Sequence, residues 1–130
     1  MPKPVDKLTE KRRNGTLSAM PTAFAEEAIH LREGGLTDDM IARATGAARS
    51  TVRDWFARRS APTGQRAERL AELSSIVERL PRVMRVDYIP VWLTKPIEAL
   101  DDEKPLDLIA RGEYRSVARV VSELEDPGAV

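Results

Sequence analysis

Residues 36–59, LTDDMIARATGAARSTVRDWFARR, predict two short helices joined by a tight turn. Thr37 suits the N-cap of the first helix, and the aspartates that follow it suit the positive end of the helix dipole. Leu36 is placed to pack on Ile41 as a hydrophobic staple. Gly46 tolerates a positive φ angle, so the first helix can end at this residue.

The second helix of this stretch has one apolar side and one basic side. Val52, Trp55 and Phe56 recur at helical spacing, while the arginines and hydroxyl residues fall on the other faces. This pattern is typical of a helix-turn-helix, whose second helix packs on one side and reads DNA with the other. A helical hairpin with a solvated charged surface is the alternative. If the helix binds DNA, we expect base contacts from Arg49, Ser50, Thr51 and Arg53, and phosphate contacts from Arg58, Arg59 and Arg66.

The composition excludes several kinds of site. None of the 130 residues is a cysteine, so the chain has neither disulfides nor thiolate metal ligands. The single histidine, His30, has no partner at metal-ligand spacing, and the acidic run at residues 101–103 is typical of a solvated loop. No nucleophile with a neighbouring base and no glycine-rich phosphate loop is present. We therefore expect a protein that is not an enzyme and binds no cofactor or metal.

The sequence also lacks signals for membranes and secretion. No apolar run reaches the roughly 18 residues that a transmembrane helix needs, and the N-terminus has no signal-peptide core. A cytoplasmic protein that does not contact a membrane is the expectation.

Charge is distributed unevenly, although the formal net charge is zero. Residues 1–20 carry five basic and two acidic side chains, and residues 70–130 carry eight basic and twelve acidic ones. A basic front and an acidic back suggest two surfaces with different partners. Residues 1–19 are predicted to be a flexible basic arm, in which Lys11, Arg12 and Arg13 either contact DNA or belong to a solvated tail.

Two further helices are predicted on either side of the helix-turn-helix. Residues 21–34 place apolar side chains on one face and end at two glycines. Residues 65–80 form a stronger amphipathic helix, with Ile76 beside its apolar stripe and Pro81 after it. This stripe can fill the core or serve as a dimer seam. The two apolar faces consist of Phe24, Ala28, Ile29 and Leu31, and of Leu70, Leu73, Val77 and Leu80.

Residues 86–130 contain short helical pieces separated by prolines. Lys95-Pro96 and Lys104-Pro105 each predict a helix start, because proline is favoured in the first turn of a helix. Gly112 predicts a helix end. Residues 113–124 predict a last helix with Val117, Val120, Val121 and Leu124 on one face. A second small core is expected from Trp92, Leu93, Ile97, Leu100, Leu106 and Ile109. No strand-like alternation occurs, so the predicted fold class is all-α.

Three segments of this C-terminal part resemble a known family. They are WLTKPIEAL at residues 92–100, KPLDLIARGEY at residues 104–114, and RSVARVV at residues 115–121. In this order they resemble the C-terminal domain of the Xre/MbcA/ParS-type antitoxins, over roughly residues 87–124. A helix-turn-helix is the usual N-terminal companion of that domain. The positions that carry the resemblance are Trp92, Pro96, Leu100, Pro105, Asp107, Leu108, Gly112, Tyr114 and Val117.

The resemblance implies the antitoxin of a type II toxin–antitoxin system. In that family the C-terminal domain blocks a RES-type toxin that degrades NAD, and the helix-turn-helix represses the antitoxin's own operon. The implied organisation is a basic arm at residues 1–19, a DNA-binding helix-turn-helix bundle at residues 20–80 and a small helical toxin-binding domain at residues 81–130. We expect a homodimer or a hetero-oligomer with the toxin. Toxin contacts are expected from Arg111, Glu113, Tyr114, Arg115 and the tail that ends at Val130.

Some alternatives remain open at this stage. Tyr114 could belong to the core and the tail could be frayed. The chain could be a stand-alone helix-turn-helix repressor whose C-terminal part only dimerises, or an adaptor that does not bind DNA. One position also departs from the usual pattern, since Ala48 stands where many such turns place a Ser or Thr cap. The loss of that cap is worth about 1 kcal/mol of helix stability.

Overall fold

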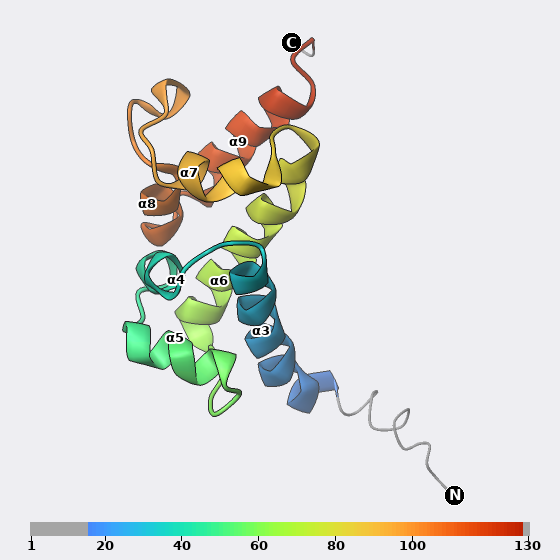
Figure 1. The fold of residues 1–130 in the computed structure, drawn as a ribbon, viewed down its shortest axis with the longest axis vertical. Helices are drawn as coiled ribbons and strands as arrows, with labels where there is room; N and C mark the ends of the chain where they lie inside the picture. The colour runs from blue at the N-terminus through green and yellow to red at the C-terminus, as the bar shows by residue number, and fades with distance from the viewer. Residues whose placement is uncertain (1–15, 129–130) are drawn as a thin grey trace, which may run out of the picture.

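The computed structural model describes the backbone of residues 16–128 and the side chains of residues 23–128, and within this range it is all-helical (Figure 1). The fold class predicted from the sequence is therefore confirmed. One isolated bridge between Ile97 and Glu103 is the sole extended pairing in the described part of the chain. The α-helices are α3 (Thr16–Glu33), α4 (Asp38–Thr45), α5 (Arg49–Phe56), α6 (Gly64–Arg79), α7 (Ile89–Leu93), α8 (Pro105–Ala110) and α9 (Tyr114–Glu125). Single 3₁₀ turns are η1 (Leu80–Arg82), η2 (Val86–Tyr88) and η3 (Glu98–Leu100).

The two short helices and the turn predicted for residues 36–59 are present as α4 and α5. The Thr37 side chain accepts a hydrogen bond from the Met40 amide at 3.1 Å, as an N-cap should. Gly46 ends α4 with a φ of 79°, in the left-handed region that glycine adopts without strain. Ala48 is the N-cap of α5 and makes no side-chain hydrogen bond, so the start of α5 lacks the cap that α4 has.

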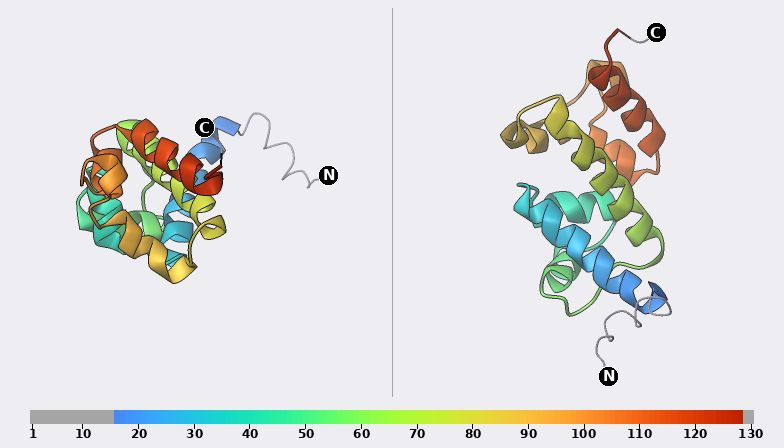
Figure 2. Two further views of the ribbon diagram at one scale, coloured as in Figure 1. Left: turned by 90° about the horizontal axis from the view of Figure 1, so that it is seen from above. Right: turned by 90° about the vertical axis from the view of Figure 1, so that its right-hand side faces the viewer.

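Helix α6 supports both halves of the molecule. It packs on α3 and α4 at one end and on α8 and α9 at the other, and Figures 1 and 2 show it running along the long axis. Ile76 lies in the middle of its buried stripe, whereas Val77 is only half-buried, so the predicted register was wrong at this pair. The fully buried side chains of the stripe are Leu70, Leu73, Ile76 and Leu80.

The hydrophobic core is continuous across the two predicted domains. One cluster of buried residues extends from Ala28 in α3 through α6 to Val121 in α9. The expected second small core was therefore wrong, because its residues share α6 with the helix-turn-helix. Trp92, Leu93, Leu100, Leu106 and Ile109 are buried in this common core, and Ile97 packs against it.

The proline and glycine signals of the C-terminal half give a mixed outcome. Pro105 opens α8 as predicted, and Gly112, with a φ of 87°, follows the end of that helix. Hydrogen bonds from the Gly112 amide to the Ile109 carbonyl and from the Glu113 amide to the Leu108 carbonyl complete a Schellman motif. Pro96 does not open an α-helix.

The chain after Pro96 instead forms a short loop. Ile97 is extended and its amide donates to the Glu103 carbonyl at 3.1 Å. The single 3₁₀ turn η3 ends at Asp101 and Asp102, whose φ angles of 58° and 63° reverse the chain. Two consecutive left-handed residues cannot continue a right-handed helix, which is why this helix prediction failed.

Both ends of the described chain differ from expectation. Helix α3 begins at Thr16 rather than near Pro21, so residues 16–19 are helical and not part of a flexible arm. Lys11, Arg12 and Arg13 lie outside the described residues. Along α3, Ala28, Ile29 and Leu31 are buried as predicted, Ala25 completes their face, and Phe24 is half-buried.

Leu124 in the last turn of α9 was expected in the core and is 42% exposed. Its packing partner α6 ends at Arg79, so the final turn of α9 extends beyond the core.

Candidate DNA and partner interfaces

The open side of α5 carries most of the predicted base-contacting residues. Val52 and Trp55 are buried, with exposed fractions of 0% and 1%, and they fix which side of α5 faces the core. Arg49, Ser50 and Arg53 are exposed on the remaining surface. Thr51 is half-buried, so its hydroxyl is less accessible than the sequence suggested.

Three of the predicted arginines form ion pairs within the protein. Arg53 Nε lies 2.9 Å from Asp38 Oδ2 at the start of α4. Arg58 has a φ of 58° and pairs with Glu26 of α3. Arg59 Nη2 lies 3.1 Å from Asp54 Oδ1. Among the described residues, neither Arg49 nor Arg66 has a carboxylate within 4.0 Å, so these two remain available to an anionic partner.

Asp54 is a functional candidate that the sequence analysis missed. It lies one helical turn after Ser50, on the side of α5 away from Val52, and its side chain is 45% exposed. A carboxylate at such a position can accept a hydrogen bond from the amino group of cytosine. The spacing of four residues from Ser50 was the signal that could have identified it.

Helix α4 and the C-terminal helix α8 are joined by an ion pair as well as by packing. Arg43 Nε in α4 lies 2.7 Å from Asp107 Oδ1 in the first turn of α8. Asp107 is one of the positions that carry the family resemblance, so the acidic residue after the second proline has a structural role here. It ties α8 to α4, where the two helices pack.

The predicted partner cluster around Gly112 is only partly a free surface. Arg111 is exposed but bridges Glu103 at 3.2 Å and Glu113 at 3.3 Å, and both carboxylates raise the pKa of its guanidinium. Tyr114 is half-buried against the core, with its hydroxyl 3.4 Å from Ser75 Oγ, so the alternative that it is a core residue is the better description.

Two arginines remain open on the exposed side of α9. Arg115 and Arg119 lie one turn apart and form no ion pair within residues 23–128. Val130 lies outside the described residues, so its predicted contact with a partner stays a prediction.

The end of α9 is held against the end of α6. Arg79 donates from Nη2 to Glu125 Oε1 at 2.7 Å and to Ser122 Oγ at 2.9 Å. The hydrogen bond from Arg79 lowers the pKa of the Glu125 carboxyl. Leu124 is exposed beside this clamp, where an apolar side chain has no partner in the described part of the chain.

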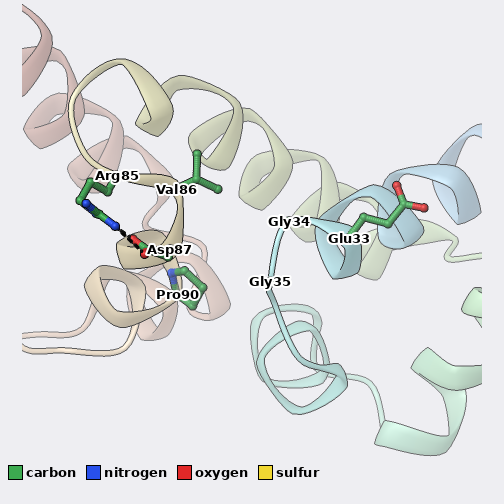
Figure 3. A pocket seen from close by; sticks show the side chains of 7 residues that line it. All are labelled: Glu33, Gly34, Gly35, Arg85, Val86, Asp87 and Pro90. Atoms are coloured by element: carbon green, nitrogen blue, oxygen red, sulfur yellow. Dashed lines mark hydrogen bonds and ion pairs between the residues drawn. The ribbon is translucent and has the colours of Figure 1, made fainter.

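A second surface lies at the turn after α3. A groove of about 700 Å³ lies between Glu33, Gly34 and Gly35 on one side and residues 85–87 with Pro90 on the other, and Figure 3 draws these residues. Arg85 and Asp87 form an ion pair at its edge, at 3.0 Å. Val86 in the groove lining is 55% exposed and Val91, which follows the lining residue Pro90, is 51% exposed, and neither was among the residues that the sequence singled out.

Other kinds of site find no support in the described residues. No group of His, Cys, Asp and Glu side chains there could hold a metal ion. None of the helices described is both long and apolar enough to cross a membrane.

Comparison with known proteins identifies one group of relatives, although no protein-family model matches the chain. The mycobacterial cidal antitoxin MbcA of Mycobacterium tuberculosis H37Rv is 29% identical over 92 residues, covering 71% of this chain and 81% of MbcA. MbcA of Mycobacterium bovis matches to the same extent. The crystal structure of the M. tuberculosis MbcT–MbcA toxin–antitoxin complex contains a chain that superposes with a TM-score of 0.66 and 26% identity, over 88% of this chain and 97% of that chain. The similarities in sequence and in fold together support an antitoxin of the MbcA type.

Proposed function

We propose that this chain is the antitoxin of a type II module, that it blocks a RES-type toxin which degrades NAD, and that its helix-turn-helix represses the operon. The observation that carries the proposal is the similarity to a chain of the MbcT–MbcA complex, because it covers 88% of this chain and therefore extends over both of its halves. The residues from Trp92 to Val117 that resemble the antitoxin domain support the RES-type partner.

The α5 helix is the proposed DNA-binding element. Its first turn presents Arg49 and Ser50 to solvent, and Arg49 has no intrachain carboxylate partner among the described residues. An arginine in the first turn of a recognition helix can form two hydrogen bonds to guanine. Arg66 in the first turn of α6 is placed to add a phosphate contact.

The outer side of α9 is the proposed toxin-binding surface. Arg115 and Arg119 offer two cations there that are unpaired among the described residues, and Leu124, on the valine face of α9 but beyond the core, adds an exposed apolar side chain at the helix end. Arginine and apolar anchors of this kind contribute strongly to protein interfaces. Because α5 and the C-terminal end of α9 lie at opposite ends of the long axis (Figure 1), one copy can hold toxin and DNA together.

Co-expression with the reading frame adjacent to its gene tests the antitoxin assignment. We expect that frame alone to stop growth and deplete cellular NAD, co-expression to restore both, and the purified complex to contain both chains by native mass measurement. A neighbour that is harmless alone, or that does not co-purify, would contradict the proposal.

Two matched variants separate the two surfaces. Arg115→Glu combined with Arg119→Glu should abolish toxin neutralisation and leave the gel shift of upstream DNA unchanged. Arg49→Ala should abolish the gel shift and leave toxin neutralisation unchanged. Both variants change exposed side chains, so both should keep the helical circular dichroism of the wild type.

A stand-alone repressor is the second candidate. It is favoured by the exposed apolar residues Val86 and Val91 beside the groove, which would suit self-association. In that case the chain would shift its upstream DNA as a dimer and no neighbouring toxin would co-purify.

A further inference from the structure

The ion pair between Asp38 and Arg53 lies on the proposed DNA-facing side of the helix-turn-helix. Arg53 follows Arg49 by one helical turn, so the two guanidinium groups emerge on the same side of α5. Arg53 Nε donates to Asp38 Oδ2 at 2.9 Å, and its side chain is nevertheless 58% exposed. The pair is therefore formed at the surface, where a DNA phosphate could compete for it.

The same arrangement recurs at the other end of the helix. Arg58 is paired with Glu26, and Arg59 is paired with Asp54. Arg49 is the one arginine of residues 49–59 without a carboxylate within ion-pair distance in the described part of the chain. Intrachain carboxylates thus pair with three of the five arginines that the sequence assigned to DNA, and within the described residues Arg49 and Arg66 have no such partner.

We propose that Asp38 limits the affinity of this protein for DNA by competing with phosphate for Arg53. The inference rests on the proposed DNA-binding function. In the free protein the Asp38 carboxylate accepts a hydrogen bond from Arg53 Nε, so a DNA phosphate must compete with that carboxylate for the charge of Arg53. Arg49, which has no carboxylate partner among the described residues, contacts the DNA without such competition. Asp38 sets how much free energy the phosphate contact of Arg53 contributes to binding.

The salt dependence of binding gives this inference a measurable signature. Each phosphate neutralised by a protein cation adds about 0.9 to the slope of log K against log salt on duplex DNA. An arginine that is paired with a carboxylate before binding and with a phosphate after binding is neutralised in both states. It therefore adds much less than about 0.9 to the slope. Removing the Asp38 charge should therefore steepen the slope by up to about 0.9. Exposed ion pairs change an equilibrium constant by up to about fivefold, so the gain in affinity should be about twofold to fivefold.

The test compares Asp38→Asn with Asp39→Asn in the full chain. Asp39 is the matched control, because it lies in the same first turn of α4, is exposed and has no ion-pair partner within the described range. Binding is measured by fluorescence anisotropy between about 50 and 200 mM salt, on a duplex from upstream of the gene and on a scrambled duplex. We expect D38N to tighten both duplexes equally and to steepen the slope, because phosphate contacts carry no sequence information. D39N should leave the slope unchanged.

A double-mutant cycle shows whether Arg53 carries the effect. The gain from D38N should disappear in an Arg53→Gln background, and circular dichroism should report the same helix content for all variants. Equal slopes for D38N and D39N, a gain that persists without Arg53, or a gain confined to the upstream duplex would overturn the inference. If the wild type bound neither duplex, the proposed DNA-binding function itself would fail.

Discussion

Replacing Ala48 by Ser should stabilise the protein by supplying the missing cap of α5. Ala48 has φ and ψ angles of −74° and 155°, which is the extended conformation that an N-cap residue adopts. The backbone is therefore already arranged for a capping side chain. Ala48 is also exposed, so a hydroxyl group meets no steric obstacle. We expect the new hydroxyl to accept a hydrogen bond from the Thr51 amide.

The stability gained by Ala48→Ser can be compared with the cap that the neighbouring helix α4 already has. Thr37 already caps α4 through the equivalent bond to the Met40 amide, at 3.1 Å. Exchanges between Ala and a good N-cap residue change stability by about 1 kcal/mol, within a range of roughly 0.5–2 kcal/mol. Ala48→Ser should thus gain about what Thr37→Ala loses, which corresponds to a shift of about 4 °C in the melting temperature of a domain this size.

Urea denaturation followed by circular dichroism measures both changes, and Ala57→Ser provides the control. Ala57 is exposed at the opposite end of α5, where no free amide awaits a cap, so that substitution should change stability by less than about 0.5 kcal/mol. If Ala48→Ser left the midpoint unchanged while Thr37→Ala lowered it, the start of α5 would not be a true helix N-terminus. The assignment of Arg49 and Ser50 to the first turn would then be wrong.

Three further predictions address pH, cooperativity and the toxin surface. Burial, and then the charge of Glu78, raise the pKa of Glu27. The ionised form of Glu27 therefore destabilises the fold, and this cost appears as pH rises through the raised pKa. Glu27→Gln should increase the melting temperature at pH 7 and leave it nearly unchanged at pH 4. Trp55→Phe and Trp92→Phe each leave a single tryptophan, and the two remaining tryptophans lie in opposite halves of the molecule. Because one core spans both halves, the urea transitions followed by fluorescence and by circular dichroism should coincide in each variant. Separate transitions would show two independent domains. Leu124→Asp should weaken toxin binding at least tenfold with little change in stability, whereas Val91→Asp should leave toxin binding unchanged. The opposite result would indicate that the toxin contacts the groove of Figure 3.

Local signals predicted the elements of this fold well. The caps at Thr37, Gly46 and Gly112 and the helix start at Pro105 depend on backbone geometry that a few residues determine. The same argument failed at Pro96, because the chain after it forms a loop that turns back at Asp101 and Asp102 and is closed by the hydrogen bond from Ile97 to Glu103. Proline permits a helix start, but it does not require one.

The candidate interface was harder to predict than the fold. Sequence spacing placed Arg49 and Arg53 on one side of α5, which the structure confirms, but it could not show that Asp38, fifteen residues away, holds Arg53. Tyr114, for which the sequence left a core position and a partner contact open, is half-buried with its hydroxyl near Ser75 of α6, and that packing depends on the register between helices far apart in the chain. Charge partners across helices are set by tertiary packing, and a single sequence does not contain that register explicitly.

The internal pairing of arginines bears on how many copies must bind DNA. Non-specific affinity for DNA comes chiefly from phosphates neutralised by unpaired cations, and the first turn of α5 offers Arg49 alone in that state among the described residues. Under the proposed DNA-binding function, one copy therefore offers few unpaired cations among the described residues assigned to DNA, namely Arg49 and Arg66, and its formal net charge is zero. Two copies of α5 spaced by one turn of the duplex would double both the base contacts and the phosphate contacts. If the proposed DNA-binding function holds, we expect stable operator binding to need more than one copy, and the exposed apolar residues on η2, α7 and α9 lie away from α5. We accordingly expect the fraction of DNA bound to rise more steeply with protein concentration than one-to-one binding predicts. Addition of a toxin that bridges two antitoxins should also increase it.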